Sequence, residues 1–447
     1  MSSYVFLGEV RGDRAGYAVS SAGDIDGDGL GDLIVGAPYS DLAGYDAGLV
    51  YIVAASDLDA ADAASGGPDG VILLEDVARQ PGSYRLIGDV TRLTAFDEDF
   101  EFGDLLGLSV SLAGDVDGDG RGDLLIGAPL AIREGALVGV TYLVTAAGLA
   151  AADAEDGTAD GDIQVAALPG MSGTYEIRTD AAVSFGASVE SAGDTDGDGR
   201  GDLLIGARGA DTGGELSGGT FLLAVTDLAA ADAADGTVDG VILLSVSENP
   251  QPFSYRFIGV DEGDQAGSSV ASAGDVDGDG RPDLMIGAPW ADGGGAPTGE
   301  VYLVAAAELA NADGADGSTD GVVDLGFVAA QPASYRFVGA ALDDRAGFRV
   351  AALGDIDGDA RSELLIGSDW DDATGLGSTG TVHLVAATDL VAADAADGTA
   401  DGVIELGHVA GQPGSYRFDG AGTGNRAGFS VASAGDVDGD GRNDVLI

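Results

Sequence analysis

One nine-residue acidic pattern occurs six times along the chain. Its first copy reads Asp-Ile-Asp-Gly-Asp-Gly-Leu-Gly-Asp from Asp24 to Asp32. The other copies begin at Asp115, Asp194, Asp275, Asp355 and Asp436, so successive starts lie 91, 79, 81, 80 and 81 residues apart. Such a regular spacing indicates a repeat architecture in which every unit carries one copy of the same loop.

The pattern has the chemistry of a calcium loop. Calcium takes six to eight oxygen ligands at about 2.3–2.6 Å, and carboxylates at alternate positions of a tight loop can turn onto one ion. The intervening glycines let the backbone curl. We assign side-chain oxygens from positions 1, 3, 5 and 9 and a backbone carbonyl from position 7. The assigned residues are Asp24, Asp26, Asp28, Leu30 and Asp32; Asp115, Asp117, Asp119, Arg121 and Asp123; Asp194, Asp196, Asp198, Arg200 and Asp202; Asp275, Asp277, Asp279, Arg281 and Asp283; Asp355, Asp357, Asp359, Arg361 and Glu363; and Asp436, Asp438, Asp440, Arg442 and Asp444.

These loops predict about six Ca²⁺ ions. Mg²⁺ suits them less because it demands tight octahedral geometry and keeps its waters. The site at Asp355 is expected to be weaker, since Ala360 replaces a turn glycine and Glu363 replaces the last Asp. A second acidic motif, from Asp232 to Asp239, could supply further ligands, but its spacing favours an exposed helix end followed by an Asp-Gly turn.

Each repeat reads as short strands around the acidic loop. In the unit from Ser254 to Ala333, strands are expected at 254–259, 266–274, 284–289 and 299–304. An Ala-rich segment follows in each unit and predicts one or two helical turns, with Asp227 as a plausible N-cap and Gly236 or Gly398 as the residue after the helix. A further short strand, 241–244, precedes the next unit. Four or five strands per repeat favour an all-β fold, a β-propeller, over a solenoid of shorter period.

The residues also carry a family resemblance. Three motifs resemble those of FG-GAP repeats. They are Phe185-Gly186 and its variants, the Gly-Asp-x-Asp-Gly-Asp-Gly core, and Gly-Ala-Pro at 36–38, 127–129 and 287–289. The resemblance covers nearly the whole chain and implies a propeller like the head of integrin α subunits, in a bacterial extracellular protein. It implies a single domain over 1–447 with repeats at about 3–82, 83–173, 174–253, 254–333 and 334–414, and a partial sixth at 415–447. Because the sixth repeat stops before its Gly-Ala-Pro, we expect a longer parent chain that completes the ring.

Composition excludes several classes of partner. The chain has 19 basic and 77 acidic residues, a net charge of −58, and every basic residue is Arg. Nucleic acid is excluded because phosphate binding needs a basic face, and an anionic membrane surface is disfavoured for the same reason. No uncharged apolar run of 18 residues appears, so no membrane insertion is expected. There is no Cys and no visible signal peptide; an extracellular or cell-surface location is expected from the resemblance.

The sequence favours an interaction module rather than an enzyme. No catalytic residues are assigned: His383 fills a strand position that other repeats give to Tyr302 or Tyr142, and His408 lies beside a turn. The expected role is adhesion or surface display, with a protein or carbohydrate ligand on the loop face. The alternative is an accessory propeller domain of a larger secreted hydrolase, as in some phospholipases.

Two further sequence features bear on ligand binding. Arg-Gly-Asp occurs at 11–13, 121–123 and 200–202. In the last two copies the Asp is the predicted metal ligand at loop position 9, so we expect it to be withheld from a receptor, and we interpret the first as a coincidence. An insertion at 91–102, with Phe96, Phe100 and Phe102, fits a partner contact and a tolerated insertion equally well.

Overall fold

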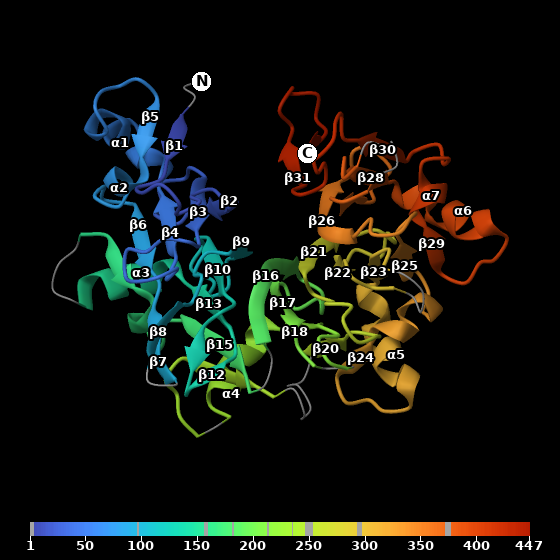
Figure 1. Cartoon of the computed structure of the whole chain (residues 1–447), viewed down its shortest axis with the longest axis horizontal. Coiled ribbons are helices and arrows are strands. Elements are labelled where there is room, and N and C mark those ends of the chain that lie inside the picture. Colours follow the sequence, from blue (N-terminus) through green and yellow to red (C-terminus); the bar gives the residue numbers. More distant parts are fainter. Residues whose placement is uncertain are drawn as a thin grey trace. The chain divides into compact units, whose positions relative to one another are not determined.

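The computed structural model describes residues 4–95, 98–155, 160–180, 183–211, 214–234, 236–245, 254–292, 297–371 and 377–447. The chain forms two compact units, of which the first holds residues 1–191 and 225–246 and the second holds 192–224 and 247–447. Both are built from small sheets (Figure 1). The chain passes from the first unit to the second within β16 (Val183–Gly193).

The first unit contains two five-stranded sheets in the orders β14-β6-β4-β3-β2 and β19-β15-β13-β10-β9. Their strands are β2 (Ala18–Gly23), β3 (Asp32–Ala37), β4 (Leu49–Val53), β6 (Tyr84–Ile87), β9 (Ser109–Gly114), β10 (Asp123–Ala128), β13 (Val140–Val144), β14 (Asp162–Gln164), β15 (Tyr175–Thr179) and β19 (Val241–Leu244). Four strands of each sheet are antiparallel, and the fifth is added in parallel to the outer strand. These are the strands that the sequence predicted for a repeat.

Short elements complete the first unit. They are β1 (Val5–Leu7), which pairs in parallel with β5 (Val71–Leu73), the hairpin β11 (Ile132–Arg133) and β12 (Ala136–Leu137), the helices α1 (Leu58–Ala64), α2 (Leu74–Val77), α3 (Ala146–Glu155) and α4 (Leu228–Asp232), and the 3₁₀ turns η1 (Ala55–Asp57), η2 (Val165–Ala167) and η3 (Val225–Asp227).

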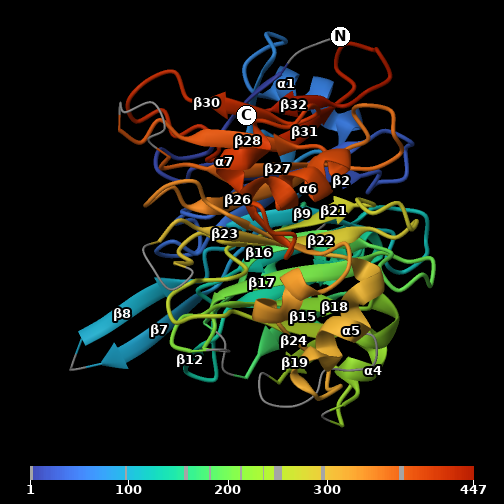
Figure 2. The same cartoon turned by 90° about the vertical axis from the view of Figure 1, so that its right-hand side faces the viewer.

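The insertion at 91–102 forms a two-stranded hairpin, β7 (Val90–Ala95) and β8 (Glu98–Gly103). Figure 2 shows it projecting as a separate ribbon. Phe96 lies outside the described residues, as do the side chains of residues 91–102. The choice between a partner contact and a tolerated insertion therefore stays open.

The second unit repeats the same plan. Its strands are β17 (Asp202–Gly209), β18 (Gly219–Leu223), β20 (Tyr255–Ile258), β21 (Ser269–Gly274), β22 (Asp283–Ala288), β23 (Glu300–Val304), β24 (Val322–Asp324), β25 (Tyr335–Val338), β26 (Ala346–Gly354), β27 (Glu363–Ser368), β28 (Thr381–Val385), β29 (Val403–Glu405), β30 (Tyr416–Asp419), β31 (Ala432–Gly435) and β32 (Asp444–Leu446). The strand order β21-β22-β23-β25-β29 matches the first-unit sheets, and β31 and β32 form a two-stranded sheet.

Helical segments of the second unit follow the third strand of a sheet, as the Ala-rich sequence predicted, and further short ones (η6 and α7) follow the strands β24 and β29. They are η4 (Ala306–Glu308), α5 (Leu309–Asp313), η5 (Gly314–Asp316), η6 (Leu325–Ala330), η7 (Ala387–Asp389), α6 (Leu390–Asp394), η8 (Ala395–Asp397) and α7 (Leu406–Val409). Gly398, at φ +97°, ends η8 in the left-handed region where glycine is favoured.

The predicted N-cap role of Asp227 is wrong. Its backbone is already helical, and its side chain makes no capping hydrogen bond. The equivalent Asp57 shows what this residue type does instead, because its carboxylate accepts hydrogen bonds from the Gly82 amide at 2.9 Å and the Ser83 hydroxyl at 2.8 Å. The carboxylate therefore fastens the chain that leads into the outer strand of the sheet.

The exposed helix end expected at Asp232 is also wrong. Asp232 is buried, and its Oδ1 accepts a hydrogen bond from the Gly240 amide at 2.9 Å. Asp62 and Asp394 accept from Gly70 and Gly402 in the same way. The motif is thus a turn closed by a buried carboxylate. We still prefer a structural role for it over a metal site, but the carboxylate that closes the turn is buried and not exposed.

The middle strands form the core. Every residue of β10, β13, β22 and β23 is buried. Apolar side chains such as Ile126, Val140 and Leu149 form one cluster of the first unit, and Ile286, Val304 and Leu309 belong to one of the second. The cores hold the strand ends in place, and the acidic loops connect these ends.

Candidate metal loops

Each acidic loop joins the first two strands of a sheet. In the first unit the loops connect β2 to β3 and β9 to β10. In the second unit they follow β16, β21, β26 and β31. A register shift in the strand pair marks the entry to the loop, as between Ser272 and Gly274, where Gly274 has φ +66°. The bulge directs the chain out of the sheet.

Backbone amides order the carboxylates within the loop. Asp275 accepts hydrogen bonds from Gly278 at 2.7 Å and Gly280 at 2.9 Å, one on each oxygen. Asp277 accepts from the Asp279 amide at 3.0 Å, and Asp279 accepts from the Arg281 amide at 2.8 Å. Gly278 and Gly280 have φ values of +85° and +90°, which explains the glycines of the pattern.

The last carboxylate of the loop lies deepest. Asp283 is 1% exposed, and its two oxygens accept from the amides of Val276 at 3.0 Å and Ala306 at 2.9 Å. It thereby ties the loop to the helical turn η4. Burial raises the pKa of Asp283 to about 7, and it raises the pKa of Asp123 and Asp202 to about 6. A nearby cation would offset this cost of burying charge.

Carboxylate oxygens converge in these loops. In each cluster, one oxygen from each of three residues lies within 4.8 Å of the others. The clusters include Asp24, Asp26 and Asp32; Asp115, Asp117 and Asp123; Asp194, Asp196 and Asp198; Asp275, Asp277 and Asp279; and Asp355, Asp357 and Asp359. Positions 1 and 3 therefore meet in all five loops, joined by position 9 in the first two and by position 5 in the other three. An all-oxygen anionic donor set of this kind fits a hard divalent cation.

The fifth loop keeps the backbone of the others despite its substitutions. Ala360 adopts φ +71° at the position of Gly280, and its amide still donates to Asp355 at 2.9 Å. Glu363 replaces the last Asp and accepts from the Ile356 amide at 2.8 Å. The substitutions leave strain at Ala360, because an L-residue in the left-handed region costs about 1–2 kcal/mol.

The arginines at loop position 7 have a role that the sequence did not reveal. A Cβ placed on Gly27 would lie 3.3 Å from Nε of Arg121, and one on Gly278 would lie 3.5 Å from Nε of Arg361. Each guanidinium therefore lies against the preceding loop of its own unit. Burial raises the pKa of Asp277, and the positive charge of Arg361 counters part of this rise. The arginine therefore offsets part of the negative charge of the neighbouring loop. The signal was the recurrence of Arg at this position in every loop after the first.

The three Arg-Gly-Asp tripeptides do not expose their aspartates. Asp123 and Asp202 are 0% and 1% exposed, as their predicted place at loop position 9 requires. Asp13 is 5% exposed, and its carboxylate is hydrogen-bonded to the side chain of Ser40. Since a receptor must reach the carboxylate of such a tripeptide, none of the three is suited to that contact.

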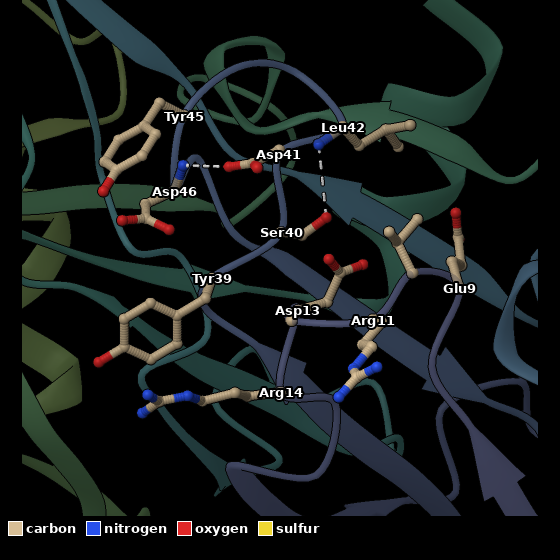
Figure 3. Close-up of a pocket in the computed structure, with 12 residues that line it drawn as sticks. Glu9, Arg11, Asp13, Arg14, Tyr39, Ser40, Asp41, Leu42, Tyr45 and Asp46 are labelled. Carbon is tan, nitrogen blue, oxygen red and sulfur yellow. Dashed lines mark hydrogen bonds between the residues drawn. The ribbon is translucent and has the colours of Figure 1, made fainter.

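Arg11 and Asp13 instead line a pocket of about 480 Å³ in the first unit. Figure 3 shows Arg14 beneath the ring of Tyr39, with its guanidinium carbon 4.4 Å from the ring centroid. Asp41 accepts a hydrogen bond from the Asp46 amide at 2.8 Å, and Tyr45 is 63% exposed. The pocket thus offers aromatic faces next to charges of both signs.

Comparison with known families agrees with these features. The FG-GAP repeat model matches residues 15–53, 106–147 and 266–304, each of which contains an acidic loop with its flanking strands. The chain is an FG-GAP repeat protein. With its mostly antiparallel sheets, its fold is the predicted β-propeller.

This FG-GAP protein is similar to several integrin α chains. It is 30% identical to integrin alpha-PS5 of Drosophila melanogaster over 210 residues, which are 46% of this chain and 16% of the relative. It is 29% identical to integrin alpha-V of Gallus gallus over 213 residues, 47% of this chain and 16% of the relative. It is 27% identical to integrin alpha pat-2 of Caenorhabditis briggsae over 293 residues, 64% and 18% of the two chains. The chain therefore spans less than a fifth of the length of each of these relatives.

The helices of the FG-GAP protein are short. Among the described residues, none is long and apolar enough to cross a membrane.

Proposed function

We propose that the chain is a calcium-stabilised, extracellular β-propeller that acts as an interaction or adhesion module and not as an enzyme. The observation that carries this proposal is the convergence of three carboxylates in five of the acidic loops. Without a cation these like charges repel one another, and a ligand that binds only the folded state stabilises it by mass action. Similarity to integrin α chains supports the adhesion role and the extracellular location.

Each Ca²⁺ would be held by the carboxylates at positions 1, 3, 5 and 9 and the carbonyl at position 7. In the fourth loop these are Asp275, Asp277, Asp279, Asp283 and the carbonyl of Arg281. Bound calcium would offset half of the negative charge of the four carboxylates in a loop and fix two strands of the sheet. With at least one carboxylate bidentate, these five residues would supply the six or more oxygens that calcium takes and leave no open position for metal catalysis, which favours a structural role.

The experiment is a thermal unfolding series in EDTA and in increasing Ca²⁺. Melting temperature should rise strongly with millimolar calcium and fall again when EDTA is added, with a smaller rise in Mg²⁺. The variant Glu262→Gln removes an exposed acid outside the loops and should leave the calcium response unchanged. A melting temperature that is the same in EDTA and in calcium would refute the stabilising role.

The ligand of such a module is proposed to be a protein or a carbohydrate that contacts loops between the strands. In the first unit the pocket beside Tyr45 is suited to it, because an exposed aromatic ring next to charged groups can pack on a sugar or an amphipathic side chain. Binding to glycan and extracellular-matrix protein arrays, compared between the wild type and Tyr45→Ser, tests this surface. Equal signals from the two proteins would place the ligand elsewhere.

A further inference from the structure

Both tryptophans of the chain pack against one arginine of the second unit. The guanidinium carbon of Arg345 lies 4.1 Å from the ring centroid of Trp290 and 4.0 Å from that of Trp370. Trp290 follows β22 in the fourth repeat, whereas Arg345 directly precedes β26 and Trp370 follows β27 in the fifth. These three residues, the tryptophan–arginine cluster, therefore join two successive repeats.

The cluster lies away from the acidic loops. β22 begins at Asp283, the last carboxylate of the fourth loop, and ends at Ala288, on the side of Trp290. Its six extended residues, at about 3.3 Å each, separate the two ends by roughly 20 Å. β27 separates Glu363 from Trp370 in the same way. A ligand of the cluster would therefore share no oxygen ligand with calcium.

The guanidinium of Arg345 keeps its hydrogen-bond donors unused. Among the residues that the structure describes it has no hydrogen-bond or ion-pair partner, and its Nε is buried. The two indole rings attract the cation but offer it no oxygen acceptor. Asp369, which precedes Trp370, is engaged with another residue, because its Oδ2 accepts a hydrogen bond from Nε of Arg426 at 3.0 Å. The donors of Arg345 are thus left for a ligand.

The rings of the cluster are open to solvent on the sides that Arg345 does not cover. Trp290 is 39% exposed and Trp370 is 41% exposed. The large aromatic residues of the third strands are buried instead, as Tyr142 and Tyr302 are. The cluster therefore presents apolar aromatic surface directly beside a fixed positive charge.

The fold does not require this cluster. In the first repeat, Arg14 and Tyr39 form a one-ring version, with the guanidinium carbon 4.4 Å from the ring centroid. The second repeat has Leu105 and Leu130 at the same two positions, yet Leu105 keeps the left-handed turn, with φ +54° against +57° at Arg345. The turn belongs to the repeat, and the two tryptophans around one arginine are an addition to it.

A carboxylate carried by a sugar ring matches both parts of the cluster. A guanidinium binds the two oxygens of a carboxylate with parallel hydrogen bonds, and two rings that already hold Arg345 reduce the freedom it loses on binding. The C–H face of a sugar is apolar and packs on an exposed aromatic ring. A phosphate ester carries up to two charges, so a protein with a net charge of −58 would repel it more than a carboxylate.

We propose that Trp290, Arg345 and Trp370 bind an acidic saccharide, a glycan whose rings carry carboxylates. The carboxylate lies on Arg345, and the sugar ring packs against the indoles. This site rests on the proposed role of the propeller as an interaction module and gives it a ligand class. It is separate from the pocket beside Tyr45, which belongs to the first unit.

Tryptophan fluorescence reports this site alone, because the chain has no other tryptophan. Trigalacturonate, a trisaccharide of a uronic acid, should change the emission of the calcium-saturated 447-residue chain in a saturable way. Galactotriose of the same linkage has the same rings without the carboxylates and should bind at least tenfold more weakly.

Arg345→Gln keeps both tryptophans and should weaken trigalacturonate binding at least tenfold. Glutamine suits the turn, because Gln265 holds the equivalent position of the fourth repeat with φ +55°. The melting temperature in calcium checks that the variant is folded. Arg79→Gln removes an exposed arginine of the first unit and should leave the titration unchanged.

A triglutamate peptide carries carboxylates without sugar rings and should bind more weakly than trigalacturonate. Peptide binding as tight as that of the trisaccharide would overturn the saccharide assignment. The site itself would be refuted by a wild type without a saturable emission change, or by unchanged affinity in Arg345→Gln. These results are read separately from the calcium response of the melting temperature, so failure of this site is distinguished from failure of the calcium-stabilised module.

Discussion

The fourth and fifth repeats have nearly the same backbone but differ in chemistry at two places, the acidic loop and the third strand. At the loop end, Gly280 and Asp283 of the fourth repeat are replaced by Ala360 and Glu363, yet the hydrogen bonds within the loop persist. In the middle of the third strands, the hydroxyl of Tyr302 donates to Glu300, whereas the ring nitrogens of His383 have no hydrogen-bond partner among the residues that the structure describes. A repeat can thus keep its fold while the loop and the third strand change separately.

The largest expected effect contrasts the two loops directly. Asp277→Ala should lower calcium affinity at one site by more than tenfold, about 1.4 kcal/mol or more, and reduce the melting temperature. Asp357→Ala should cost less, because the fifth loop already carries Ala360 and Glu363. Calorimetric titration of both variants measures the order. Equal losses would show that the two loops bind calcium alike.

A reciprocal exchange at the turn should have an intermediate effect. Gly280→Ala places a side chain at φ +90° in open space, so only backbone strain opposes it, and unfolding free energy should fall by about 1 kcal/mol. Ala360→Gly should relieve strain at φ +71° and raise stability by a similar or smaller amount. Denaturant unfolding in calcium measures both. Changes of the same sign would contradict the strain assigned to Ala360.

The smallest expected effect concerns Asp264, a buried acid in a turn of the fourth repeat. Burial raises the pKa of Asp264 to about 6. Between about pH 4 and pH 6 the unfolded chain releases this proton while the folded chain keeps it, so the contribution of Asp264 to stability falls as pH rises.

Asp264→Asn should therefore leave stability unchanged near pH 4 and raise it modestly at pH 7. Denaturant unfolding of variant and wild type at the two pH values gives the difference. Glu262→Gln, which removes an exposed acid of the same turn, is the control and should show no such dependence. A gain from Asp264→Asn that is equal at both pH values would contradict the role of ionisation.

Local pattern was sufficient to predict the strands, the acidic loops and the place of His383. Alternating apolar residues predicted β20 and β23, and Asp-Gly spacing predicted loops that the backbone amides indeed order. Contacts made by side chains with residues far away in the sequence were not predictable. The bonds of Asp57 to Gly82 and Ser83, and the position of Arg121 over Gly27, join residues 25 or more positions apart, and propensity carries no information about such contacts.

The parallel fifth strand has a consequence for synthesis on the ribosome. Arg85 of β6 donates to both oxygens of Asp162 in β14, at 2.8 and 2.6 Å, across a separation of 77 residues. At a translation rate of about 5–20 residues per second, the sheet would wait roughly 4 to 15 seconds for its last strand. The outer edge of each newly made sheet is therefore open while the next repeat emerges. A nascent chain of this kind would need its acidic surface, which repels copies of itself, to keep these edges apart.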